Sequence, residues 1–138
     1  MKQYELMPNT TPTLEEYVTL CSNVGWEEYM NFDVAETSLA HSVYSVMVKD
    51  RNEVIGMGRI VGDGAIYFYI QDVVVHPDYQ SKGIGKEIMD ELMRYIKENA
   101  PSKAFVGLFA SQGKEAFYEQ YDFKDYSPYM TGMFKVNP

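Results

Sequence analysis

The feature that most constrains this chain is a long apolar run that leads directly into a glycine-containing loop and an amphipathic segment. Residues 65–75 are rich in β-branched and aromatic side chains, which is typical of a strand. From Ile84 to Ile96 apolar side chains recur every three or four residues, and this spacing predicts a helix with one buried face. A strand, a loop containing Gly83 and Gly85, and a helix therefore follow one another without interruption.

The rest of the chain predicts an α/β fold on a mixed sheet. Thr13 and Glu16 form a capping-box pattern, so the first element is expected to be a helix that starts near Leu14. By the crossover rule, a strand that follows the helix from Ile84 should run parallel to the strand 65–75. The remaining elements are expected in this order: a short helix over 34–40, a hairpin over 43–61, a buried strand over 104–109, a short helix over 114–121 and a final strand over 126–136, interrupted at Pro128.

Composition limits the class of protein and its partners. A chain of 138 residues that is 46% hydrophobic and has no low-complexity linker is expected to form one domain over residues 1–138. Its net charge of -8 argues against a nucleic-acid partner, and no apolar stretch approaches the roughly 20 residues of a membrane span. Cys21 has no second cysteine, and neither it nor His41 and His76 has metal-ligand spacing. We therefore expect a cytoplasmic protein with no metal and no membrane partner.

The loop after the strand 65–75 is suited to bind phosphate through its backbone. Gly83 and Gly85 let the main chain approach an anion closely, and the first amides of the helix point at it with the positive end of the helix dipole. A P-loop would need four residues between its glycines and a Ser or Thr after the lysine. A dinucleotide fingerprint would need a small residue where Ile88 stands. Neither of these phosphate loops matches the spacing.

The pattern Gln-x-x-Gly-x-Gly at residues 80–85, preceded by Val-Val-Val-His-Pro-Asp-Tyr, resembles the cofactor motif of the GNAT superfamily of N-acetyltransferases. Residues 116–123 (AFYEQYDF) resemble the second motif of that superfamily, so the resemblance covers most of the chain. It implies an α/β, GNAT-like acyl-CoA N-acyltransferase fold. In that fold a mixed, mostly antiparallel central sheet splays between two parallel strands and is flanked by about four helices.

The resemblance also implies where acetyl-CoA binds. Backbone groups of Val73 and Val75 would pair with the pantetheine arm, as an added strand would. The pyrophosphate would lie in a cradle formed by Gln80, Ser81, Lys82, Gly83, Ile84, Gly85 and Lys86.

Two side chains are candidates for the catalytic steps. Tyr118 matches the family tyrosine near the cofactor sulfur, and a phenol with a pKa of about 10 can protonate a leaving thiolate. The amine must also lose a proton, and where relatives often carry a glutamate this chain has Gln71, which cannot act as a base. Asp72, expected on the other face of the strand, is one candidate base, and a relayed water is another. The family glycine is replaced by Asp122, a residue type that tolerates a left-handed turn.

These implications predict an enzyme that transfers the acetyl group of acetyl-CoA to an amine, expected to be a small molecule, by direct attack in a ternary complex. One alternative is a non-catalytic acyl-CoA binding or sensing module, and another is a partner-binding protein that keeps the fold without the ligand. We expect His41 to cap a helix and His76 to be a non-catalytic turn residue. Residues 26–41 and 126–137 would select the acceptor, and monomer and homodimer both fit the sequence.

Overall fold

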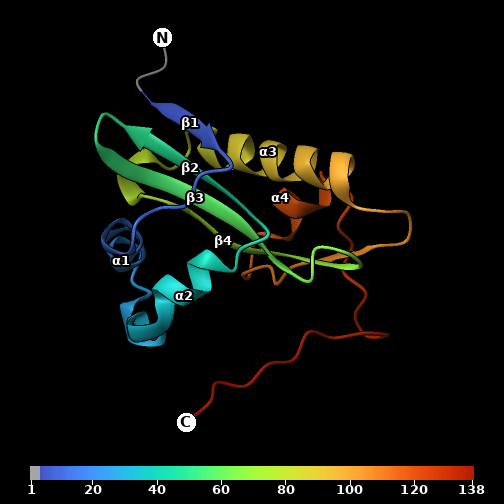
Figure 1. Ribbon diagram of the computed structural model, residues 1–138. Helices are drawn as coiled ribbons and strands as arrows, with labels where there is room; N and C mark the ends of the chain where they lie inside the picture. Colours follow the sequence, from blue (N-terminus) through green and yellow to red (C-terminus); the bar gives the residue numbers. More distant parts are fainter. Residues whose placement is uncertain (1–3) are drawn as a thin grey trace. The chain divides into compact units, whose positions relative to one another are not determined.

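A computed structural model describes residues 4–138 (Figure 1). The chain separates into two compact units. The first unit ends at Val106, and the second comprises Gly107–Pro138. Each unit is described by itself below. The expectation of a single domain over residues 1–138 stays a prediction.

A five-stranded sheet forms the centre of the first unit, and its last strand ends at Gly107, the first residue of the second unit. Its strands lie in the order β1 (Glu5–Pro8), β2 (Tyr44–Asp50), β3 (Glu53–Gly62), β4 (Tyr67–Val75) and β5 (Phe105–Gly107). The three pairings β1–β2, β2–β3 and β3–β4 are antiparallel, and the sheet as a whole is mixed, as expected. The expectation that the first element is a helix is wrong, because β1 precedes it. This strand of four residues has too few positions to show an alternating pattern, and its pairing with β2 defines it.

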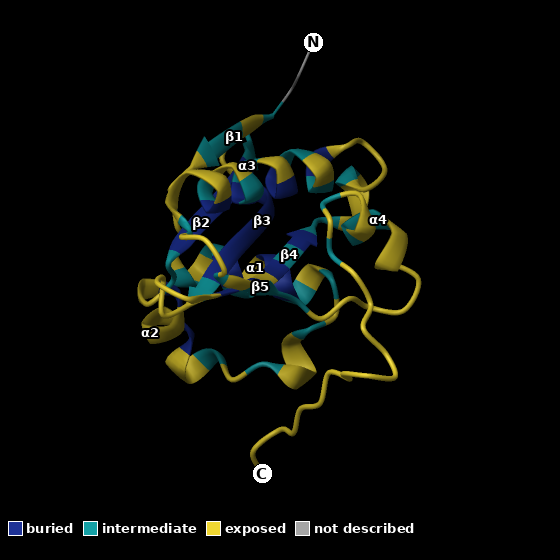
Figure 2. Ribbon diagram, turned by 90° about the vertical axis from the view of Figure 1, so that its right-hand side faces the viewer, coloured by how far each residue is buried: buried dark blue, intermediate teal, exposed yellow. Residues whose placement is uncertain are grey.

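Helices α1 (Leu14–Asn23) and α3 (Ile84–Asn99) cover opposite faces of the sheet (Figure 1). The capping box is confirmed: the Thr13 hydroxyl accepts a hydrogen bond from the Glu16 N–H at 3.1 Å, and the Thr13 N–H donates to the Glu16 carboxylate at 2.9 Å. The short helix α2 (Ala35–Ala40) also lies where it was expected. Buried residues concentrate in β2, β3 and β4, between the two long helices (Figure 2).

Two expected strands differ from the structure. Strand β5 covers only Phe105–Gly107 of the expected range 104–109, and it is not buried, since the Phe105 side chain is 51% exposed. Residues 126–136 form no strand. A strand exists only where a neighbour accepts and donates its backbone hydrogen bonds, and an apolar sequence pattern cannot supply that neighbour. Helix α4 (Glu115–Glu119), in the second unit, lies within the range expected for it.

Candidate active site

A β-bulge interrupts the pairing of β3 with β4. Between two consecutive paired positions, β3 contains one residue, Gly58, whereas β4 contains two, Asp72 and Val73. Asp72 has a left-handed φ of 55°, which costs an L-residue roughly 1–2 kcal/mol. The expectation that Asp72 faces away from Gln71 is wrong, because the bulge breaks the alternation. Gln71 is paired with Arg59, and the Asp72 carboxylate is also bonded to Arg59, so both side chains lie on one face.

The end of β4 directs part of its backbone toward an open edge. The His76 N–H donates to the Ile55 carbonyl of β3 at 2.7 Å, and backbone groups alternate in direction along a strand. The groups of Val73 and Val75 therefore point away from β3. Strand β5 has three residues against nine in β4, and Phe105 bonds to the Ile66 carbonyl, just before β4 begins. Strand β5 thus pairs at the start of β4 and not at its end.

The loop after β4 is held by a compact set of local hydrogen bonds. His76 Nδ1 accepts from the Asp78 N–H at 3.0 Å and caps a single 3-10 turn, Pro77–Tyr79. The Gln80 side chain donates through Nε2 to the Val75 carbonyl at 3.0 Å and so ties the loop to the end of β4. Ser81 and Gly83 both have left-handed φ angles, of 65° and 84°. His76 has the turn role expected for it.

Gly83 is the N-cap of α3 and leaves space at the start of this helix. A side chain at Gly83 would meet no atom within 4 Å. The Glu87 N–H donates to the Gly83 carbonyl at 3.1 Å, and the N–H groups at the start of a helix point out of its N-terminus. Ile84, which is 1% exposed, anchors the helix in the core, whereas residues 80–83 are exposed. The start of α3 is therefore an exposed opening beside the N–H groups of the first helical turn.

Two lysines flank this opening. Lys82 Nζ lies 5.7 Å from the centroid of the Tyr79 ring, within the range of a cation–π contact. The Tyr79 hydroxyl in turn donates to the Asp50 carboxylate, and this hydrogen bond raises the pKa of Tyr79. Lys86 forms an exposed ion pair with Asp90 at 3.0 Å. Exposed pairs of this kind contribute about 0.3–0.5 kcal/mol, so the Lys86 ammonium can exchange Asp90 for another anion.

Asp72 belongs to a buried polar network. Its Oδ2 atom accepts hydrogen bonds from the Tyr17 hydroxyl and from Arg59 Nε, each at 2.8 Å. Burial, together with the Asp72 carboxylate, raises the pKa of Tyr17 well above its ordinary value. Sequence reasoning did not single out Arg59, although an arginine inside the apolar run of β3 is a signal. A charge at such a position has to find a buried partner.

Cys21 and His41 have the roles expected for them. Cys21 is fully buried in the core between α1 and the sheet. Burial, and then the nearby Asp72 carboxylate, raises the pKa of the Cys21 thiol to about 11, so the thiolate is scarce at neutral pH. His41 ends α2 and contacts the Thr37 carbonyl through Nδ1 at 2.8 Å.

The second unit contains Tyr118, on α4. Its ring packs edge-on against Phe117, with centroids 5.0 Å apart, and against Phe123 at 6.4 Å. Burial raises the pKa of Tyr118 above its usual value. Asp122 follows the helix with a left-handed φ of 71°, so aspartate does adopt the turn for which the family motif has glycine.

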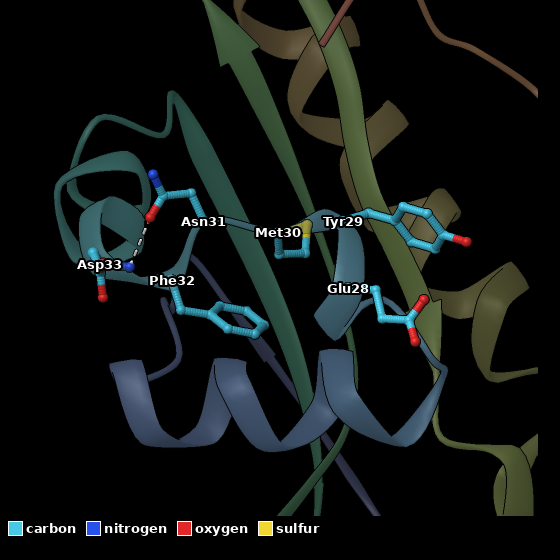
Figure 3. A pocket seen from close by; sticks show the side chains of 6 residues that line it. All are labelled: Glu28, Tyr29, Met30, Asn31, Phe32 and Asp33. Atoms are coloured by element: carbon cyan, nitrogen blue, oxygen red, sulfur yellow. Dashed lines mark hydrogen bonds between the residues drawn. The ribbon is translucent and has the colours of Figure 1, made fainter. Parts of the chain in front are cut away.

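The segment between α1 and α2 forms an open hollow (Figure 3). Asn31 shapes it by accepting a hydrogen bond from the Asp33 N–H at 3.1 Å. Carboxylates and aromatic rings occur together around this hollow. The lining residues are Glu28, Tyr29, Met30, Asn31, Phe32 and Asp33.

Among residues 4–138, no group of three or more His, Cys, Asp or Glu side chains is placed to hold a metal ion. Within the same residues, none of the helices combines the length and the apolar character needed to cross a membrane.

A mixed sheet with a bulged strand, a glycine-capped helix after it and an open strand edge define an acyl-CoA-type acyltransferase fold. Comparison with known proteins identifies the family: the profile of the Acetyltransferase (GNAT) domain matches residues 13–131. The protein belongs to the GNAT acetyltransferase family, as the sequence motifs predicted. Membership in this family supports acetyl transfer as its general activity.

The relatives agree with this assignment over most of the chain. An uncharacterized ycf52-like N-acetyltransferase of Prochlorococcus marinus is 33% identical over 123 residues, which are 85% of this chain and 67% of the relative. A crystal structure of a probable acetyltransferase from meticillin-resistant Staphylococcus aureus is 30% identical, with a TM-score of 0.89 and coverage of 97% and 99% of the two chains. A GNAT-family acetyltransferase from Streptococcus pneumoniae is 31% identical, with a TM-score of 0.81 and coverage of 97% and 98%.

Proposed function

We propose that this protein is an acetyl-CoA-dependent N-acetyltransferase that acetylates a small-molecule amine by direct attack in a ternary complex. The observation that carries the proposal is the opening at the start of α3. There Gly83 combines a left-handed φ with open space, and Gln80 fastens the loop to the end of β4. A side chain at position 83 would project into this open space.

The residues present fit the pyrophosphate and the pantetheine arm of acetyl-CoA. The first-turn amides of α3 and the ammonium groups of Lys82 and Lys86 would hold the pyrophosphate, within the predicted cradle of residues 80–86. The backbone of Val73 and Val75, directed to the open edge of β4, would hold the pantetheine arm as an added strand. When bound, acetyl-CoA supplies a thioester whose acyl carbon the acceptor amine attacks.

Acetyl transfer requires two proton transfers, one to the departing thiolate and one from the acceptor amine. The phenol of Tyr118, kept protonated by its raised pKa, is proposed to protonate the departing thiolate. The proton of the amine is proposed to leave through Asp72 or through a relayed water, because Gln71 accepts none. Direct transfer is supported by Cys21: a fully buried thiol with a pKa of about 11 is a poor acyl acceptor.

The acceptor, the partners and the cellular location of the protein are also proposed. Acidic and aromatic residues together line the hollow at 28–33, and this combination favours a cationic amine over an anionic one. The net charge of -8 supports the absence of a nucleic-acid partner. A cytoplasmic location is supported by the single unpaired cysteine. We propose no membrane partner, and both a monomer and a homodimer are compatible with the chain.

A second candidate is a non-catalytic acyl-CoA binding or sensing module. Gln71 favours it, since this amide stands on β4 directly before the bulge, where relatives often carry a basic carboxylate. The two candidates differ in turnover and share cofactor binding.

The test is a calorimetric titration with acetyl-CoA and with acetyl-pantetheine, which lacks the pyrophosphate. We expect wild-type affinity for acetyl-CoA in the micromolar to millimolar range, on the order of typical KM values, and much weaker binding of acetyl-pantetheine. The variant Gly83→Glu should lose about tenfold or more of the acetyl-CoA affinity, because a carboxylate would stand where the phosphates bind.

Gly25→Glu is the matched control for this titration. Gly25 has a φ of 82°, nearly that of Gly83, and also has no atom within 4 Å of its missing side chain. The control therefore carries the same strain and the same added charge away from the loop, and it should bind acetyl-CoA normally. Absence of binding by the wild type would overturn the proposed function. Binding without acetylation of any amine in a screen of small amines would favour the sensing module.

A further inference from the structure

The strongest unexplained feature of the first unit is a strained residue held by a buried charge pair. Asp72 has a φ of 55° and is 7% exposed, and its carboxylate is bonded to Arg59, which is 6% exposed. Burying two charges costs several kcal/mol per ion before their attraction is counted. Strain and a buried ion pair at the same residue are conditions that commonly mark a functional constraint.

The network also joins three separate elements to the bulge. Tyr17 reaches Asp72 from α1. Arg59 Nη1 donates to the Ser38 carbonyl and to the Ser42 hydroxyl, both at 3.1 Å, and Nη2 donates to the Ser38 hydroxyl at 3.0 Å. Ser38 lies in α2 and Ser42 just after it. The nitrogens of one guanidinium therefore connect the bulge of β4 with the helix that precedes β2.

We infer that Arg59 and Tyr17 are positioning residues that hold Asp72 in the bulged conformation and thereby select which backbone groups of β4 face the open edge. The inference rests on the proposed function, in which that edge receives the pantetheine arm. Neither residue would touch the cofactor or the acceptor.

The geometry of the pairing explains why the bulge matters. If β4 paired regularly from Gln71 onward, each later residue would move by one position against β3. Val73 would then lie opposite Met57, and its backbone groups would turn inward to β3. Asp72 and Val74 would face the edge instead, and the Asp72 carboxylate would point at the apolar face covered by α3. A one-residue change thus exchanges the whole set of edge-facing groups.

Arg59 opposes this regular pairing. Its side chain lies on the α1 face, where it would be a buried charge without a carboxylate if Asp72 turned to the other face. In the bulged register, the Asp72 carboxylate is paired with the Arg59 guanidinium and accepts a hydrogen bond from the Tyr17 hydroxyl. These contacts therefore stabilise the bulged register over the regular one. Both of these bonds are made to the same carboxylate oxygen, Asp72 Oδ2.

The test is a cycle of three variants, Arg59→Met, Asp72→Asn and the double variant, with acetyl-CoA affinity measured by calorimetry and kcat measured against pH. If Arg59 and Asp72 act by positioning, each single variant should weaken acetyl-CoA binding by about tenfold or more. The double variant should then bind acetyl-CoA no more weakly than either single variant does. The pH profile of kcat should keep its shape. If Asp72 is instead the base, Asp72→Asn would bind acetyl-CoA normally but would lose turnover and change the pH profile of kcat. In that case Arg59→Met would also bind acetyl-CoA normally.

Tyr17→Phe is a more conservative variant, which tests the inference even if Arg59→Met or Asp72→Asn does not fold. It removes only the hydroxyl bonded to Asp72 and keeps the ring that packs edge-on against Phe32. We expect it to weaken acetyl-CoA binding by a smaller factor, about two- to threefold, and to lower the melting temperature by several degrees without preventing folding. Lys49→Met is the control, because Lys49 also links the sheet to α1, through Glu16 at 3.2 Å, and should leave binding unchanged. Normal binding by Tyr17→Phe and Arg59→Met would overturn the inference, whereas a wild type that does not bind would overturn the proposed function itself.

Discussion

Tyr118 keeps its phenol protonated to higher pH than an exposed tyrosine does, because burial raises its pKa. We predict that Tyr118→Phe lowers kcat by about 10²–10⁴, the usual contribution of a general acid, and leaves acetyl-CoA affinity unchanged. The acid form persists above the ordinary tyrosine pKa of about 10. Loss of this proton should therefore cause no fall in the wild-type kcat below about pH 10. Steady-state kinetics across the alkaline range would check both statements.

The control for this variant is Tyr67→Phe, which removes a phenol from a side chain that is 56% exposed and lies outside the segments expected to select the acceptor. It should behave as the wild type. An unchanged kcat in Tyr118→Phe would remove Tyr118 from the mechanism and leave the protonation of the thiolate to water.

Helix α3 lies close to β3 because two glycines face it. A methyl group at Gly58 would come within 2.6 Å of Ile88 Cγ2 and 3.1 Å of Leu92 Cδ1, which is closer than side chains pack. We predict that Gly58→Ala lowers the free energy of unfolding by about 1–3 kcal/mol, as overpacking does. Denaturant titration would measure this change.

The partner variant Ile88→Ala separates overpacking from other causes. Alone it should cost about 2–5 kcal/mol, since it opens a cavity in the core. Combined with Gly58→Ala, it removes the atom that clashes, so the double variant should lose less than the sum of the two single losses. Strict additivity would show that the contact between Gly58 and α3 is not the source of the effect.

Thermal unfolding of the 138-residue chain, which separates after Val106 into two compact units, would test the expectation of a single domain. If residues 1–138 form one domain, heating should give one transition in which the calorimetric and van't Hoff enthalpies agree. Acetyl-CoA at about 100 times its Kd should stabilise the protein by about 2.7 kcal/mol and shift this transition upward. Two resolved transitions would contradict the expectation.

Local patterns were sufficient for much of this protein. The capping box at Thr13, the amphipathic helix from Ile84 and the glycine at position 83 each depend on neighbours within a few residues, so their structures were predictable. The family could also be predicted, because its two motifs are short and contiguous. Asp122 belongs here too, since its left-handed turn follows from what one residue tolerates.

Contacts between distant segments decided the rest. Strand β1 forms because it pairs with β2, some forty residues later along the chain. Residues 126–136 form no strand despite their apolar pattern. The bulge at Asp72 reverses the face that simple alternation predicts, and the burial of Arg59 depends on partners from α2 and β4. Pairing and the burial of charge join residues far apart in the chain, and a local pattern carries no information about which distant partner will be present.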